Sequence, residues 1–201
     1  MNLTICIQAG GQSRRMGQNK ALLPFAGVPL IQRIVERIRP IAAEILIISD
    51  ERGRYKFLNL PILPDQIPGQ GALGGLYTAL FAASQPYVAS IACDMPFVSP
   101  GLLRAEIELL ENSRLDVAIP QTPQGLEPLH AVYRKATCLP AVEDAIRREQ
   151  RRLVSWFDQV EIRVLTAEET TLHDPLQRAF ININTPEDLA LAEALAKQAD
   201  A

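Results

Sequence analysis

A glycine-rich loop near the start of the chain is the strongest chemical signal in the sequence. It runs from Gln8 to Lys20, reads QAGGQSRRMGQNK and follows an apolar run at residues 3–7. Glycine lets a backbone approach a ligand with its N–H groups exposed, and such amides bind phosphate oxygens. Arg15 and Lys20 add the positive charge that a phosphate ligand requires. The loop matches neither the phosphate pattern GxxxxGK nor the dinucleotide pattern GxGxxG, so a surface turn with solvated charges is the alternative.

Two aspartates are candidates for metal or ligand binding beside such a loop. Asp94 comes just after the apolar run at residues 87–92, and open α/β sheets bind ligands at the carboxyl ends of their strands. An ionised carboxylate there suits Mg2+, which takes one or two carboxylates together with substrate phosphates and water. A turn cap before Pro96 is the alternative for Asp94. Asp65 lies in a loop, where aspartate is most often a turn residue.

The C-terminal part contains a second polar group of residues. Asn182 and Asn184 alternate along a strand-like segment and therefore share a face, which makes them candidates for lining the substrate or metal side of a cleft. Thr185 and Asp188 have a complete local explanation as the capping box of a helix that starts at Pro186. The asparagines are not explained by that cap.

Other reactive residue types have ordinary explanations. Cys93 has no base at nearby spacing, so a catalytic thiol is disfavoured. His130 has no triad partner that the sequence places, and a packing or hydrogen-bonding role is expected. Four arginines recur at helical spacing, as a solvated helix face or, alternatively, as a clamp for a second anionic substrate: Arg147, Arg148, Arg151 and Arg152.

Composition narrows the class of protein. The 201 residues are 48% hydrophobic and 21% charged, enough for a real core, and the net charge is -3. A mildly acidic chain is a poor candidate for broad nucleic-acid binding, which depends on neutralising many phosphates. Three cysteines match no zinc or CxxC spacing and two histidines cannot form a multi-histidine metal site. We find no signal peptide and no apolar run of about 18 residues, so a cytoplasmic protein without a membrane partner is expected.

The elements that must position these residues follow from hydrophobic periodicity. Short apolar runs alternate with helical patterns, as in βα units on a largely parallel sheet. The sequence therefore predicts one domain over residues 1–201, a three-layer α/β/α Rossmann-like fold with a mostly parallel central sheet. Strands are expected at residues 3–7, 45–48, 87–92, 116–119, 131–133 and 180–184, the segment 131–133 running against the others. Helices are expected at 30–41, 75–83, 140–150, from Pro100 with Ser99 as N-cap, and from Pro186.

Five segments, in order, resemble those of one enzyme family. AGGQSRRMGQNKALL resembles the AGGxSxRMGxxKxLL signature of small nucleotidyltransferases, specifically the molybdenum cofactor guanylyltransferase (MobA) family. The other four are LPD with GALGGL (residues 63–65 and 71–76), ACDMPF (92–97), PLHAVY (128–133) and NINTPEDL (182–189). The resemblance spans nearly the whole chain.

The resemblance implies roles for particular residues. Arg15, Lys20 and Asp94 would be catalytic, with Mg2+ on Asp94, and Asn182 and Asn184 would bind substrate. The implied nucleotide-binding residues are Gln8, Ala9, Gly10, Gly11, Lys20, Ser49, Asp65, Gly71, Gly75 and Asp94, with the glycines at 71, 74 and 75 framing guanine. Two positions depart from the family pattern. Gln8 replaces a residue that is usually apolar, so only a backbone contact is expected there, and Ser49 replaces an asparagine.

The resemblance also implies a reaction. GTP and molybdenum cofactor (Mo-molybdopterin) would give the guanine dinucleotide cofactor and pyrophosphate, with proteins that deliver or accept the cofactor as further partners. Relatives that transfer CMP tend to carry AAG where this chain has Ala9-Gly10-Gly11, which favours guanine because a larger base needs a wall without a Cβ. The alternatives are a relative that uses CTP or another small phosphorylated acceptor, and a catalytically silent nucleotide-binding regulator. Retention of both a triphosphate clamp and a metal ligand disfavours the silent protein.

Overall fold

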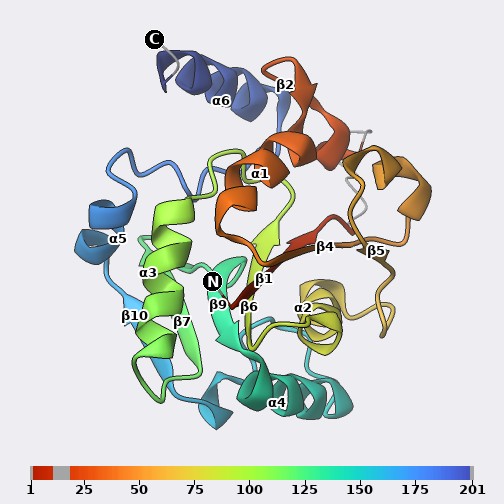
Figure 1. Ribbon diagram of the computed structural model, residues 1–201, viewed down its shortest axis with the longest axis vertical. Coiled ribbons are helices and arrows are strands. Elements are labelled where there is room, and N and C mark those ends of the chain that lie inside the picture. The colour runs from red at the N-terminus through yellow and green to blue at the C-terminus, as the bar shows by residue number, and fades with distance from the viewer. Residues whose placement is uncertain (1, 11–18, 200–201) are drawn as a thin grey trace.

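A mixed β-sheet forms the middle of the molecule (Figure 1). The structure, a computed structural model, describes residues 2–10 and 19–199. Within these residues the sheet has eight strands in the order β10-β7-β9-β6-β1-β4-β5, with β8 paired to β7. The strands are β1 Leu3–Gln8, β4 Glu44–Ile48, β5 Ile62–Leu63, β6 Tyr87–Ala92, β7 Val117–Thr122, β8 Gly125–Leu126, β9 His130–Arg134 and β10 Ile162–Leu165, and a separate hairpin joins β2 Pro24–Phe25 to β3 Val28–Pro29.

The direction of the strands sets where a ligand can bind. β1 pairs in parallel with β4 and β6, β4 with β5, and β7 with β10. β9 lies antiparallel between β6 and β7, which confirms both the mostly parallel sheet and the reversed strand at 131–133. The carboxyl ends of β1, β4, β6 and β7 therefore lie at one edge of the sheet.

Helices cover both faces of the sheet (Figure 1). They are α1 Leu30–Ile38, α2 Gly71–Ala82, α3 Pro100–Glu111, α4 Lys135–Arg147, α5 Ala167–His173 and α6 Pro186–Ala199. Along β1, Leu3, Ile5 and Ile7 lie in one apolar core with α1, α3 and α6, whereas Cys6 lies in a second core with α2 and α4. This alternation is the period of two of a strand that is buried on both faces, and it confirms the three layers.

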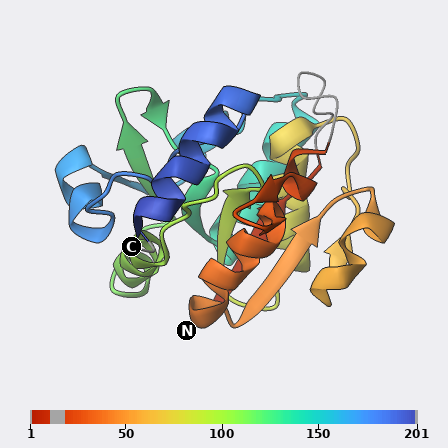
Figure 2. The ribbon, with the colours of Figure 1, turned by 90° about the horizontal axis from the view of Figure 1, so that it is seen from above.

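The long C-terminal helix closes one end of the molecule. α6 lies at the top of Figure 1 and runs across the molecule in the view from above in Figure 2. Ala192 and Ala196 bury its inner face, and the Glu193 carboxylate accepts a hydrogen bond from the Ala26 N–H of the β2–β3 hairpin at 3.3 Å. The expected cap is confirmed, because the Asp188 N–H donates to Thr185 Oγ1 and the Thr185 N–H donates to Asp188 Oδ2.

Four expected elements differ from the structure. The helix expected at 30–41 ends at Ile38 and continues as a 3-10 turn over Arg39–Ile41. α2 starts at Gly71 and not at Gly75, because a glycine-rich stretch that is typical of a loop forms its first turn. α4 runs over 135–147 and not 140–150, with Pro140 inside it at the loss of one backbone hydrogen bond. The segment 180–184 is not a strand; it makes one backbone hydrogen bond to the sheet edge, from the Ile183 N–H to the Asp94 carbonyl (2.9 Å).

The sequence reasoning also missed β10 and α5. Thr166 and Glu169 form a complete capping box at the start of α5, a signal that the sequence contains. Among the described residues, no helix combines the length and the apolar composition needed to cross a membrane.

Candidate active site

A pocket of about 240 Å³ opens at the carboxyl edge of the sheet, where β1 and β6 end beside the start of α2. Five expected site residues line it: Gln8, Ala9, Gly10, Lys20 and Asp94. The other described residues in its wall are Asn19, Ala72, Ala92, Cys93 and Leu129, which sequence reasoning did not assign to the site. Gly11 and Arg15 lie outside the described residues.

Lys20 is the centre of the charged part of the pocket. Its Nζ lies 3.3 Å from Asp94 Oδ2 and donates a hydrogen bond to Asn184 Oδ1 at 2.5 Å. Both partners of the ion pair are mostly buried, with 17% and 19% of the side chains exposed. Residues far apart in the sequence thus bring one cation and two oxygen ligands together.

Local backbone contacts hold these groups in place. Asp94 follows β6, and its carbonyl accepts the Ile183 N–H, which fixes the C-terminal segment against the sheet edge. Asp188 Oδ2 accepts the backbone N–H groups of Asn184 and Thr185 at 2.9 Å each. The bond from Asn184 is the main reason that the pKa of Asp188 is lowered. The cap of α6 therefore also positions Asn184 beside Lys20.

Asn19 and Tyr55 support the other side of Lys20. Asn19 caps the short 3-10 helix Lys20–Leu22, its Oδ1 accepting the Ala21 N–H at 3.1 Å. Its Nδ2 donates to Tyr55 Oη at 2.9 Å and to Glu51 at 2.9 Å. The sequence signal for this cap is an asparagine directly before a helical turn. Asn19 therefore orients the turn that carries Lys20.

Gly10 leaves open space beside the pocket. Among the described residues, a Cβ built there would meet only the Ile48 carbonyl oxygen, at 3.8 Å, an ordinary contact. Its φ is not left-handed, so neither its backbone conformation nor packing against the described residues requires glycine at this position. The open space fits the close approach of a ligand.

Gln8 has a side-chain role, contrary to the expectation of a backbone contact alone. Its Nε2 donates to Ser90 Oγ at 2.9 Å and to the Ala72 carbonyl at 3.3 Å. A Cβ on Gly75 would lie 2.4 Å from Gln8 Oε1. Gly75 therefore makes room for the Gln8 side chain. This packing explains why residue 75 is glycine, and no contact with a guanine base is needed to explain it.

Asp65 lies at the same sheet edge, two strands away from β1. Its N–H donates to Asp50 Oδ1 at 3.4 Å, and its own Oδ1 is buried without a hydrogen-bond partner among the described residues. Burial, and then the charge of Asp50, raise the pKa of Asp65. A buried carboxylate oxygen without a partner lacks the donor that it needs, so Asp65 is ready to accept an N–H group.

The remaining candidates lie away from the described pocket wall. Ser49 is buried, and its hydroxyl accepts the Glu51 N–H at 3.2 Å. Gly71 has a left-handed φ of 57° and starts α2. Asn182 is exposed and its Nδ2 donates to the Phe180 carbonyl at 3.1 Å, so the two asparagines do not act on one face of a strand as expected.

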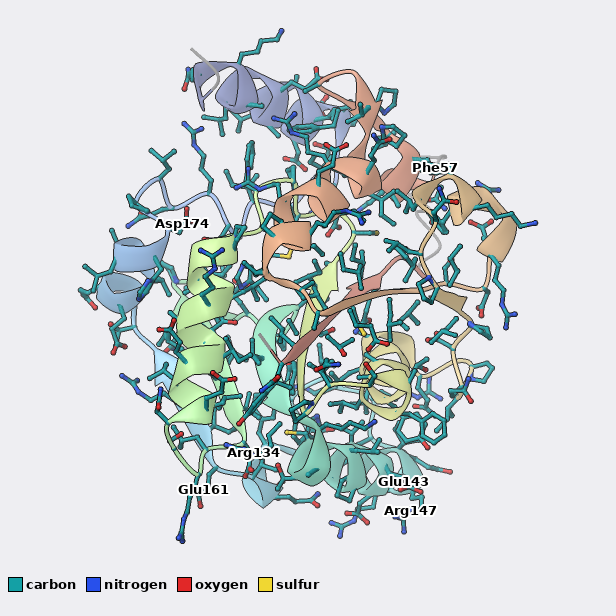
Figure 3. The ribbon with its side chains drawn as sticks, viewed as in Figure 1. Phe57, Arg134, Glu143, Arg147, Glu161 and Asp174 are labelled. Atoms are coloured by element: carbon teal, nitrogen blue, oxygen red, sulfur yellow. The ribbon has the colours of Figure 1, made fainter. Side chains whose placement is uncertain are left out.

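The four arginines do not form one helical face. α4 ends at Arg147, Arg148 caps it and pairs with Asp144 at 2.9 Å, and Arg151 and Arg152 lie beyond the helix. All four are exposed, and Figure 3 shows Arg147 on the outer side of α4, pointing away from the sheet. The structure favours solvated side chains.

Neither Cys93 nor His130 is available for catalysis. Burial, with the charge of Asp94 beside it, raises the pKa of the Cys93 thiol to about 12, so the thiol stays protonated at neutral pH. His130 is fully buried and hydrogen-bonded to Ser99 and Glu106, as expected for a structural histidine.

Comparison with known proteins shows the family of the chain. Residues 5–164 match the MobA-like NTP transferase domain. The chain belongs to this family. Within it, the chain is 41% identical to a probable molybdenum cofactor guanylyltransferase of Carboxydothermus hydrogenoformans, over 93% of each chain, and 36% identical to one of Pelotomaculum thermopropionicum, over 98% and 95%.

A solved structure supports the same placement of this MobA-like transferase. Molybdopterin-guanine dinucleotide biosynthesis protein A from Archaeoglobus fulgidus superposes with a TM-score of 0.84 at 26% identity, covering 97% of this chain and 99% of that one. The family match ends at residue 164, yet Asn184 and Asp188 complete the charged cluster from outside it.

Proposed function

We propose that this MobA-like transferase moves GMP from GTP to the phosphate of molybdenum cofactor and releases pyrophosphate. The activity named for its relatives supports this proposal. The observation that carries the proposal is the meeting of Lys20, Asp94 and Asn184 at the carboxyl edge of β1 and β6. A positive charge and two hard oxygen ligands beside a glycine-rich loop suit a nucleoside triphosphate.

The reaction needs no protein nucleophile. An oxygen of the acceptor phosphate attacks the α-phosphorus of GTP, the bond from that phosphorus to the bridging oxygen breaks, and pyrophosphate leaves with the electron pair. Lys20 holds the negative charge of the triphosphate, and Asn19 keeps the turn that carries Lys20 in place. The protonated Cys93 thiol takes no part.

The oxygen ligands around Lys20 fit Mg2+. Asp94 Oδ2 and Asn184 Oδ1 contact one ammonium group, so both already face a single cation, and such oxygens suit Mg2+ when substrate phosphates complete the shell. The described residues contain no group of three His, Cys, Asp or Glu side chains able to hold a metal by themselves. Bound Mg2+ would supply charge neutralisation at the phosphates, with Asp94 as its protein carboxylate.

Asp65 supports guanine as the base. Guanine presents two adjacent N–H donors, at N1 and at the exocyclic amine, which a carboxylate can accept together. Cytosine presents one amine beside a ring nitrogen that is itself an acceptor and would face the carboxylate. The unpartnered Asp65 Oδ1 therefore favours guanine, at about 1–3 kcal/mol for each unmet group.

An assay with purified protein tests the reaction. Transfer from GTP, CTP, ATP and UTP onto molybdenum cofactor is measured with Mg2+ present, in competition. We expect GTP to be used, and we expect Asp94→Asn to abolish transfer while its circular dichroism spectrum matches that of the wild type. Asp158→Asn, a change at an exposed carboxylate in the 3-10 helix Phe157–Gln159, is the matched control. Full Mg2+-dependent activity of Asp94→Asn would refute the role of Asp94.

Gly10→Ala tests the base site, and the nearest atom of the described residues lies an ordinary 3.8 Å from the new Cβ. We expect a sharp loss of GTP use and little change in any CTP use. If CTP outcompetes GTP in the wild-type enzyme, the guanylyl proposal is wrong and the cytidylyl alternative replaces it.

A further inference from the structure

A second pocket, of about 290 Å³, lies farther along the same sheet edge. Its walls come from the end of β7 and the following turn, from α5, and from the segment that leads to Asn182. Its lining includes Gln121, Gln124, Ala167, Thr170, Phe180 and Ile181. Asp174, which also lines it, is labelled in Figure 3 in the turn that follows α5.

Two short segments separate this pocket from the active site. Ile181 lines the second pocket, and Ile183, two residues later, donates its N–H to the Asp94 carbonyl. Two residues span at most about 7 Å of chain. On the other side, Leu129 lines the active-site pocket, while the next residue, His130, packs its ring against Phe180 of the second pocket with ring centroids 5.4 Å apart. The two pockets are therefore neighbours.

The second pocket has the chemistry of a site for a neutral, nitrogen-rich ring. Gln121 and Gln124 are exposed, and their side-chain amides make no hydrogen bond to other described residues. Each amide offers both a donor and an acceptor. Phe180 and Ile181 supply apolar wall, and Asp174 is the one charged residue in the described lining. With no lysine or arginine in that lining, the pocket does not suit a phosphate.

The two pockets therefore differ in chemical character. Lys20 stands in the first, where the acceptor phosphate must meet GTP, and amides and an aromatic side chain stand in the second. Molybdopterin has the matching division, a phosphate at one end and at the other a pterin, a flat ring system with amide-like N–H and C=O groups. We infer that the second pocket binds the pterin of the acceptor while its phosphate reaches into the first pocket, where Lys20 holds the triphosphate of GTP. The inference rests on the proposed function for the identity of the acceptor.

Filling the pocket tests this assignment. Ala167 is exposed at the first position of α5 and lines the pocket, so Ala167→Trp adds bulk there without entering the core. The variant with both Gln121→Ala and Gln124→Ala removes the free amides. Leu172→Trp, on the same helix at a side chain that is 76% exposed and outside the described lining, is the matched control.

Each protein is assayed for GMP transfer with varied molybdenum cofactor, for acceptor binding by equilibrium dialysis and for GTP binding by calorimetry. We expect Ala167→Trp and the double variant to raise the KM and the Kd for the acceptor by about tenfold or more, with the Kd for GTP unchanged and with Leu172→Trp like the wild type. Unchanged acceptor KM and Kd in both pocket variants, with the wild type active, would overturn the pterin assignment alone. A wild type that binds GTP but neither binds nor modifies the acceptor would instead refute the proposed function, and the assignment with it.

Discussion

A buried carboxyl group under the active-site edge makes stability depend on pH in a way that can be worked out. Glu106 of α3 is fully buried, and its Oε1 lies 3.3 Å from His130 Nδ1. His130 Nε2 accepts the Ser99 N–H at 3.2 Å, so the imidazole proton is assigned to Nδ1, which donates to Glu106. The other oxygen, Oε2, has no partner among the described residues. Burial raises the pKa of Glu106 from 4.5 to about 7, although His130 lowers it in part.

The direction of the pH dependence follows from the number of protons that the folded and the unfolded protein bind. Between pH 4.5 and 7 the folded protein keeps a proton on Glu106 that the unfolded chain has released, so the free energy of unfolding falls as the pH rises. At 1.36 kcal/mol for each pKa unit, the whole effect is about 3 kcal/mol. This stabilisation is fully present below pH 4.5, the pKa of Glu106 in the unfolded chain. It is lost as the pH rises through about 7, the pKa of Glu106 in the folded protein.

Urea unfolding of the wild type, Glu106→Gln and Glu108→Gln from pH 5 to pH 8 measures this effect. Gln cannot titrate, so we expect the wild type to lose about 2 to 3 kcal/mol relative to Glu106→Gln over this range. Titrating groups that do not contact Glu106 cancel in that difference. Glu108, exposed on the same helix two positions later, is the matched control and should follow the wild type. A wild-type to Glu106→Gln difference that stays constant within about 0.5 kcal/mol would refute the buried-proton argument.

Three further outcomes are expected. Gly75→Ala should destabilise the protein by about 1–3 kcal/mol, because the Cβ displaces the Gln8 amide from its hydrogen bonds; most of this cost should vanish in a Gln8→Ala background, and urea unfolding in which the two changes are simply additive would contradict the coupling. Lys20→Ala should weaken GTP binding more than GMP binding by calorimetry, because a point charge best serves the outer phosphates; equal losses would place Lys20 elsewhere. Thr166→Ala should lower the free energy of unfolding by about 1 kcal/mol through loss of the capping box with Glu169, and an unchanged urea midpoint would argue against that cap.

The parts of the fold that could be predicted are those where local pattern and tertiary structure agree. Residues 87–92 form the expected strand, and Ser99 caps α3 with Pro100 at its first position. The start of α2 was missed because four glycines in its sequence and neighbourhood indicate a loop, whereas α2 is stabilised by burial of Leu73 and Leu76 against the sheet. Residues 180–184 have the β-branched residues of a strand but make only one backbone bond to the sheet edge.

The site could be predicted in part for a similar reason. Lys20 and Asp94 each have a strong local signal, a charged residue after a glycine-rich loop and a carboxylate after a strand. The side-chain hydrogen bonds of Gln8 to Ser90 and to the Ala72 carbonyl depend on strand register and on helix packing, which one sequence does not show. Tyr55 was missed because an aromatic residue in a short 3-10 helix, Arg52–Leu58, has no local pattern that indicates a site.

The contact between Lys20 and Asn184 joins positions 164 residues apart, and this separation bears on when the protein becomes active during its synthesis. The N-terminal loop, β6 and Asp94 leave the ribosome while the segment that carries Asn184 has still to be made. Synthesis runs at about 5–20 residues per second, so several seconds separate the synthesis of Lys20 from that of Asn184. The charged cluster is completed only when the segment that carries Asn184 docks on the sheet edge through the Ile183 N–H. A chain made only as far as Asp94 therefore carries Lys20 and the carboxylate but lacks the asparagine that completes the cluster, and we expect substrate binding to begin only after the segment with Asn184 has folded against the sheet edge.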